Sequence, residues 1–233
     1  MSQQQNSTIS GSIYDVYTDK DTRYKEQRMP RIGQVCKYED GREFVFCAAS
    51  QDVVAGKFVA APTPFAGTLV TAVNKGDTEL TVEVVPDVAA GELAGGYLSI
   101  GSTNYKIKAN SAASAGSNSK IILYDGVTAA FSATAEIKLA PERHTNCATL
   151  ASDVRAVGVV MVSTNKGSAS RVFFWAQTRG VYCGAVVTGG DVSKGDTLGV
   201  NGGDLANTSD IVAVATALVN IDDGKTGFVY IEL

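Results

Sequence analysis

From Gly33 onward, short apolar runs alternate with clusters of Gly, Asn, Asp and Ser, a pattern typical of β-strands joined by turns. In ELTVEVV (79–85), every second residue from Leu80 to Val84 is apolar, which places one apolar face on an extended chain. The clearest predicted strands are EFVFCA (43–48), TLVTAV (68–73), ELTVEVV (79–85), KIILY (120–124), VGVVMVS (157–163), RVFFWAQ (171–177), VYCGAVV (181–187) and GFVYIEL (227–233).

Dense short strands with regular turns favour an all-β fold over alternating βα units, and a β-barrel or a β-sandwich is the expected body. The pattern leaves room for short helices only, and the best candidate is CATLASDVR (147–155). We therefore predict an all-β protein.

The chain also predicts an inserted subdomain. The prolines of APTP (61–64) and Pro141 bracket a stretch that is poor in aromatic residues. This stretch contains ANSAASAGSNS (109–119), which we interpret as a flexible surface loop. We infer a small β-subdomain over residues 62–141, inserted into a body that combines residues 33–61 with 142–233. One continuous sandwich is the alternative.

Residues 1–32 differ from the rest, because they are polar and show no sustained strand or helix period. Tyr14, Tyr17, Tyr24 and Arg28 lie there in a highly charged context. We predict an extended N-terminal arm, which is either a disordered tail or a segment that becomes ordered on a partner with its tyrosines as anchors.

Composition and charge narrow the function classes. A net charge of -4 and a sequence pI of about 5.1 provide no broad positive field, so we expect no nucleic-acid partner. No run of apolar residues is long enough for a transmembrane helix, and the N-terminus lacks the apolar region of a secretory signal. We expect no membrane partner and synthesis in the cytoplasm.

The residues that usually carry chemistry do not form a recognisable constellation. Cys36, Cys47, Cys147 and Cys183 lack the paired spacing of a zinc site and have apolar or aromatic neighbours, which predicts buried free thiols. The single histidine, His144, has no second histidine nearby and no identifiable carboxylate to orient it, which indicates a surface or linker residue. We predict no enzyme activity, no cofactor and no metal, so that function resides in a surface.

Two nearly identical segments, VNKGDTEL (73–80) and VSKGDTL (192–198), stand far apart in the chain. In both, Gly lies between Lys and Asp just before a predicted strand, as in a tight reversal where one residue takes a positive φ. The sequences on either side share little, so we interpret the echo as the same turn used twice, not as a duplicated module.

The order of several motifs resembles a family of small virion proteins of tailed bacteriophages, many from marine and cyanobacterial hosts. The block that carries the resemblance begins with a strand that contains Phe174, Trp175, Gln177 and Gly180. A Gly195-Asp196 turn and a small-residue strand that ends at Ala217-Leu218 follow, and GQVCKYEDGREFVFCAAS, with Asp40-Gly41 at its turn, resembles the family's opening hairpin. Residues 62–141 match no part of the family pattern.

Similarity to these capsid decoration, or cement, proteins implies a β-rich protein on the exterior of the virion's icosahedral head. It implies the major capsid protein and neighbouring copies of the chain, commonly in a homotrimer, as partners. The arm residues named above would then contact the capsid or another subunit. The alternative is a host-surface or carbohydrate-binding module of a tail or fibre, motivated by the Ser/Gly/Asn-rich loop and by Trp175. An aromatic face such as that of Trp175 can stack on sugars, unless the side chain lies in the core.

Overall fold

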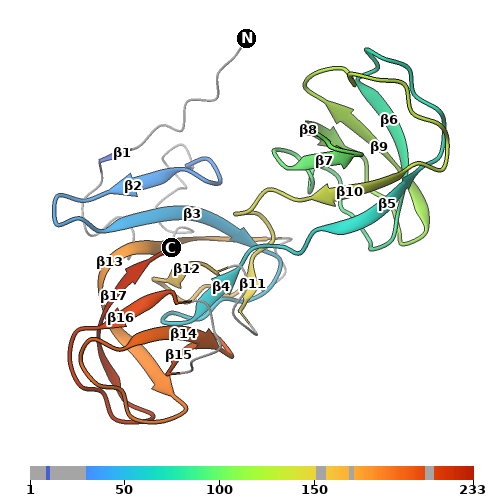
Figure 1. Ribbon diagram of the computed structural model, residues 1–233. Coiled ribbons are helices and arrows are strands. Elements are labelled where there is room, and N and C mark those ends of the chain that lie inside the picture. The colour runs from blue at the N-terminus through green and yellow to red at the C-terminus, as the bar shows by residue number, and fades with distance from the viewer. Residues whose placement is uncertain (1–8, 11–29, 151–155, 168–170, 208–212) are drawn as a thin grey trace. The chain divides into compact units, whose positions relative to one another are not determined.

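The computed structural model describes residues 9–10, 30–150, 156–167, 171–207 and 213–233, which form strands, turns and bends (Figure 1). The predicted all-β class is confirmed. The chain divides into two compact units: Pro62–Thr145, called the barrel below, and Met1–Ala61 with Asn146–Leu233, called the body. The second boundary thus follows Thr145, whereas the prolines placed it after Pro141.

The barrel is a closed sheet in the strand order β10-β5-β6-β9-β8-β7. The sheet is closed because β10 pairs with both β5 and β7. Most inward positions are apolar and meet in one core that includes Leu80, Leu98 and Ile137. Its strands are β5 (Phe65–Leu69), β6 (Glu79–Val84), β7 (Tyr97–Ile100), β8 (Thr103–Asn110), β9 (Ser117–Leu123) and β10 (Glu136–Ala140).

The body contains an 11-stranded sheet that curls on itself, because β17, at the end of the main path, also pairs with β13 (Figure 1). Its main path runs β1-β2-β3-β13-β15-β14-β16-β17, while β4, β11 and β12 branch from it. The strands are β1 (Ile9–Ser10), β2 (Val35–Lys37), β3 (Glu43–Ala49), β4 (Phe58–Ala60), β11 (Ala148–Thr149), β12 (Ala156–Val160), β13 (Val172–Thr188), β14 (Thr197–Asn201), β15 (Asp204–Ala206), β16 (Ala215–Ala217) and β17 (Thr226–Glu232).

Strand β13 joins the two halves of the body. The sequence predicted separate strands at 171–177 and 181–187, but the structure has one continuous strand of 17 residues. Its first part pairs with β3 and its second part with β17, and the register shifts between Gln177 and Arg179. The pairing of β13 changes from β3 to β17 close to Gly180, which has a φ of 96°. Residues other than glycine rarely adopt this φ.

Paired turns recur in both units. Four isolated antiparallel bridges join Val53 to Thr164, Val73 to Phe131, Val88 to Ala113, and Val192 to Ile221. Each bridge is closed by two reciprocal backbone hydrogen bonds, and each bridge residue is followed three positions later by a residue with positive φ. These residues are Gly56, Gly76, Gly91, Gly116, Thr134, Gly167, Gly195 and Gly224.

The echoed VNKGD and VSKGD segments are two of these turns, one in each unit. Gly76 has a φ of 97° and Gly195 a φ of 96°, so the predicted reversal with positive φ is confirmed. Asp77 and Asp196 each accept a hydrogen bond from the backbone N–H three residues earlier, at 2.7 Å and 2.9 Å. The shared letters therefore satisfy the same local geometry in two different sheets.

Several predictions of local secondary structure are wrong. The strands predicted over 68–73 and 157–163 are shorter, because β5 ends at Leu69 and β12 ends at Val160. Residues 148–149 form β11, which pairs with β4, where the sequence suggested a helix over 147–155; residues 151–155 lie outside the described part of the chain.

The segment 109–119 is not simply a loop, because its ends belong to β8 and β9. Asn110 is buried there. Its side-chain oxygen accepts a hydrogen bond from the Leu93 N–H, and its side-chain nitrogen donates one to the Ala89 carbonyl. This buried polar side chain is therefore hydrogen-bonded.

Candidate interface on the outer face of the body

The four predicted arm residues, Tyr14, Tyr17, Tyr24 and Arg28, lie outside the described residues. The described residues of the arm are 9–10, which form β1, and 30–32. Strand β1 pairs in parallel with β2 through Ile9–Cys36 and Ser10–Lys37. This pairing places residues 9–10 at the edge of the body sheet, next to β2.

The aromatic residues of the family-like block belong to the core. Phe174 and Trp175 are only 4% and 5% exposed. Trp175 packs edge-on against Phe46, with 5.1 Å between the ring centroids. A buried indole offers no face to a sugar. Trp175 therefore no longer supports the carbohydrate-binding alternative.

Gln177 fixes the irregular part of β13. Its side chain is fully buried, and Nε2 donates to the carbonyls of Arg179 and Val181 at 3.0 Å and 3.1 Å. These two bonds satisfy carbonyls beside the register shift, where the regular pairing with β3 ends. Its Oε1 atom has no hydrogen-bond partner among the described residues.

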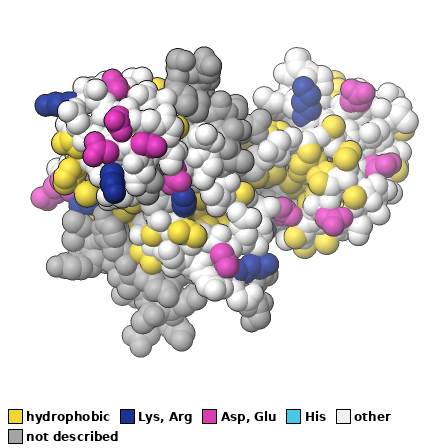
Figure 2. Space-filling model, turned by 90° about the horizontal axis from the view of Figure 1, so that it is seen from below, with side chains coloured by type: hydrophobic (Ala, Val, Ile, Leu, Met, Phe, Trp, Pro, Cys, Tyr) yellow, Lys and Arg dark blue, Asp and Glu magenta, His cyan; other side chains and the backbone are white. Residues whose placement is uncertain are grey.

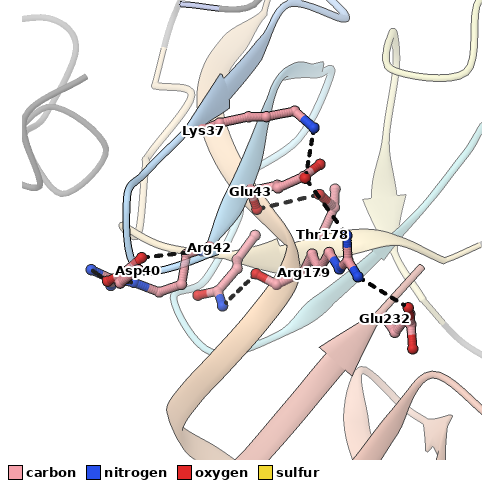
Figure 3. Close-up of polar contacts among 8 residues, drawn as sticks. Lys37, Asp40, Arg42, Glu43, Thr178, Arg179 and Glu232 are labelled. Atoms are coloured by element: carbon pink, nitrogen blue, oxygen red, sulfur yellow. Dashed lines mark hydrogen bonds and ion pairs between the residues drawn. The ribbon is translucent and has the colours of Figure 1, made fainter. Parts of the chain in front are cut away.

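Gly180 allows the β2–β3 hairpin to approach β13 closely. A Cβ at Gly180 would lie 2.8 Å from Cγ and 3.0 Å from Cα of Arg42. Arg42 is held in place by Asp40, whose carboxylate accepts bonds from the Arg42 backbone N–H and from Nε (Figure 3). Desolvation opposes ionisation of Asp40, but these hydrogen bonds and the guanidinium charge outweigh it and lower the pKa of the carboxyl group.

A row of alternating charges crosses four strands, two of which form this hairpin (Figure 3). Lys37 Nζ lies 2.7 Å from Glu43 Oε1, which in turn lies 3.9 Å from Arg179 Nη1. Arg179 Nη2 lies 3.7 Å from a carboxylate oxygen of Glu232, and Thr178 Oγ1 donates to the Glu43 carbonyl at 3.3 Å. The row ties β2, β3, β13 and β17 together at the surface.

An exposed apolar surface begins directly beyond the charged row. Val181 is opposite Tyr230, and Cys183 is opposite Phe228, in the antiparallel pairing of β13 with β17. Val181 is 46% and Phe228 49% exposed, and the Cys183 side chain is also exposed. Leu218, partly exposed, extends the surface, since its N–H donates to the Phe228 carbonyl. We call these five residues the outer strip.

The exposure of Cys183 corrects one sequence prediction. Cys36, Cys47 and Cys147 are buried as predicted, but Cys183 faces solvent. The pairing of Cys183 with Phe228, next to a register shift before Ala185, places its side chain on the outer face of the sheet.

His144 has a carboxylate partner that the sequence interpretation missed. Nδ1 of His144 lies 2.8 Å from Glu142 Oε1, and Oε2 of the same carboxylate accepts the His144 backbone N–H. Burial opposes ionisation of Glu142, but the hydrogen bonds and charge of His144 outweigh it and lower the pKa of Glu142. The backbone of Glu142 also accepts two bonds from Thr145, so the pair stabilises a turn. The sequence signal for this pair was the position of Glu142 two residues before His144 in PERH.

The described residues hold no group of three or more His, Cys, Asp or Glu side chains arranged to bind a metal ion. Across these same ranges, no helix has both the length and the apolar character needed to cross a bilayer. Lys and Arg side chains are interspersed with Asp and Glu on the face that Figure 2 shows. The outer strip has an apolar centre and the charged row at its border, which is the composition of a contact surface.

Comparison of the chain with protein-family models, with curated proteins and with solved structures found no match.

Proposed function

We propose that this protein is a decoration, or cement, protein of a bacteriophage virion, which binds the exterior of the icosahedral head through contacts with the major capsid protein. The proposal begins with the order of motifs in the sequence. Its structural support is the outer strip, because large apolar side chains that are half exposed in an isolated chain are typical of a surface that is covered in an assembly.

The location of the strip adds to this support. Four of its five residues lie on β13, which carries part of the family-like block, and on β17, while Leu218 directly follows β16. The buried residues of the block, Phe174, Trp175 and Gln177, hold β13 in place, while the next residues along the same strand, Val181 and Cys183, face outward. The buried residues of the block thus fix the position of the strand that carries Val181 and Cys183.

Repeated copies would make a small strip sufficient. Each strip offers only a few exposed apolar side chains, so a single contact is expected to be weak. On an icosahedral head, copies that also contact one another bind by avidity, and modest interfaces then hold together. A homotrimer and contacts made by the N-terminal arm are part of this proposal.

The test is co-sedimentation of the purified full chain with undecorated expanded heads. The native chain is expected to sediment with the heads, and Phe228→Ser is expected to reduce the bound fraction without lowering the thermal midpoint of the free protein. Val85→Ser is the matched control, because Val85 is 67% exposed but belongs to the barrel. Absence of binding by the native chain would overturn the function, whereas equal binding by both variants would overturn only the assignment of the strip.

The oligomeric state distinguishes contacts between copies of the chain from contacts with the major capsid protein. Sedimentation velocity of the native chain and of Phe228→Ser shows whether the strip holds copies together. If Phe228→Ser converts a native trimer to monomers, the strip is an interface between copies and not the capsid-binding surface. An unchanged oligomer together with lost head binding supports the proposal as stated.

A further inference from the structure

The barrel carries an exposed row of two tyrosines with a lysine between them. Tyr97 of β7 is opposite Lys106 of β8, and the N–H of Tyr124, just after β9, donates to the Lys106 carbonyl at 3.0 Å. The three residues therefore lie side by side on neighbouring strands. Tyr97 is 49% and Tyr124 51% exposed, although large aromatic side chains usually seek burial. We call this set the Tyr–Lys–Tyr row.

Strand alternation explains why the row faces outward. The neighbours Leu98, Tyr105 and Leu123 are buried in the barrel core, so Tyr97, Lys106 and Tyr124 point to the opposite side of the sheet. Lys106 Nζ lies 5.7 Å from the centroid of the Tyr97 ring, within the range of a cation–π contact. Because β7 and β9 flank β8, the two tyrosines are separated by two strand spacings, about 10 Å.

Two further cations border the row. Lys108 lies on β8, two residues beyond Lys106, and Lys138 of β10 is paired with Ser99 on β7. Both side chains are exposed, and neither forms an ion pair with the described residues. Lys120 of β9 is different, since its Nζ lies 2.6 Å from a carboxylate oxygen of Glu79. Two half-exposed rings and a group of lysines thus share one side of the barrel.

We propose that the Tyr–Lys–Tyr row binds an anionic oligosaccharide. A tyrosine ring offers an apolar face to a sugar ring and a hydroxyl to its polar edge, and about 10 Å between the rings accommodates a short segment of a chain. The lysine between them, with Lys108 and Lys138 nearby, supplies positive charge for a carboxylate, sulfate or phosphate group on that sugar. This site goes beyond capsid binding and does not depend on it.

The charges of the barrel favour a short anionic sugar over a nucleic acid. Asp and Glu outnumber Lys and Arg in residues 62–145, and Glu79 and Glu83 of β6 are exposed. Nucleic-acid affinity depends on the neutralisation of many phosphates in succession, and an acidic unit with a local group of lysines does not provide that. A single anionic group held between two rings requires only the local charge.

Calorimetric titration of the full chain tests the site with defined probes. The probes are an oligogalacturonate, a sulfated oligosaccharide and a phosphorylated oligosaccharide, with a neutral cello-oligosaccharide and a single-stranded oligothymidylate of similar length for comparison. We expect at least one anionic sugar to bind more tightly than the neutral sugar and the oligothymidylate. Added salt should weaken that binding, because part of the affinity is electrostatic.

Variants assign the binding to the row. Tyr97→Ala combined with Tyr124→Ala should weaken binding about tenfold or more, and Lys106→Ala should remove the preference for the anionic sugar over the neutral one. Lys75→Ala is the matched control, because Lys75 is an exposed lysine in a turn of the same barrel. Circular dichroism should show that all variants retain the β-structure.

Three outcomes would overturn the proposal. Binding of none of the anionic sugars above the neutral probe would exclude the ligand class. Tighter binding of the oligothymidylate would identify the row as a nucleic-acid surface. Equal losses in Lys75→Ala and Lys106→Ala would show general charge attraction instead of a site. The head co-sedimentation of Phe228→Ser is unaffected by each of these outcomes, so the two proposals fail separately.

Discussion

The close approach of Arg42, in the β2–β3 hairpin, to Gly180 allows a quantitative prediction for Gly180→Ala. Gly180 has a φ of 96°, where an alanine costs about 1–2 kcal/mol. The added methyl group would also meet Arg42, with Cγ at 2.8 Å and the Cα at 3.0 Å. Since the backbone of the hairpin must shift, we expect a further 1–3 kcal/mol, as in other overpacked sites. The total loss of unfolding free energy is thus about 2–5 kcal/mol.

Gly41→Ala is the matched control for this substitution. Gly41 lies in the turn of the same hairpin, has a φ of 84° and has no atom within 4 Å of an added Cβ. Alanine there incurs the backbone term alone, about 1–2 kcal/mol. The difference between the two variants therefore measures the contact with Arg42.

Denaturant unfolding followed by Trp fluorescence measures both variants. Trp175 is the single tryptophan of the chain and is buried in the body, so its emission reports on the unit that contains the hairpin. Unfolding of the barrel is not expected to alter this signal, which matters because a chain of two units need not unfold in one step. Equal losses for Gly180→Ala and Gly41→Ala would refute the close approach described here.

Three more predictions follow from other residues. A thiol reagent should modify one cysteine rapidly in the native chain, namely Cys183, and the three buried thiols only after unfolding; more than one fast equivalent would contradict the burial. Gln177→Leu should lower the unfolding free energy by about 1–3 kcal/mol in the Trp assay, because two carbonyls lose their donor; an unchanged midpoint would show that those bonds contribute nothing. The lowered pKa of Glu142 means that its ionisation stabilises the barrel above the ordinary value of 4.5, and this contribution is lost as the pH falls through the lower folded-state pKa. Between neutral pH and about pH 3, circular dichroism should show a steeper loss of thermal stability for the native chain than for Glu142→Gln, and parallel curves would contradict the pairing with His144.

The sequence was sufficient for features that depend on neighbouring residues. Alternation in ELTVEVV identified a strand that became β6, with its apolar positions in the barrel core. The glycines of VNKGD and VSKGD identified turns with positive φ, because that geometry is a property of a few consecutive residues. The same local information did not reveal that Val73 pairs with Phe131 or Val192 with Ile221, since bridge partners far apart in the chain leave no mark in either segment.

The candidate site was harder to predict, because its residues come from distant strands. Glu43, Arg179 and Glu232 are far apart in sequence and form one charged row only after β3 and β17 pair with β13. The exposed tyrosines of the barrel were not recognised either. Tyr97 and Tyr124 lie in ordinary strand-like segments, and their shared face depends on the order of β7, β8 and β9 in the closed sheet.

The segment VYCGAVV shows where the sequence by itself is decisive and where it is not. Its residues determined a strand, because apolar residues in this density favour a sheet. Both faces of that strand are apolar, so the pattern did not distinguish the covered face from the exposed one. The curl of the body sheet decided this: Tyr182 packs against core clusters, while Val181 and Cys183 face outward beside Phe228. Alternation assigns residues to two faces, and only the strands that pack against one of those faces determine which of them is buried.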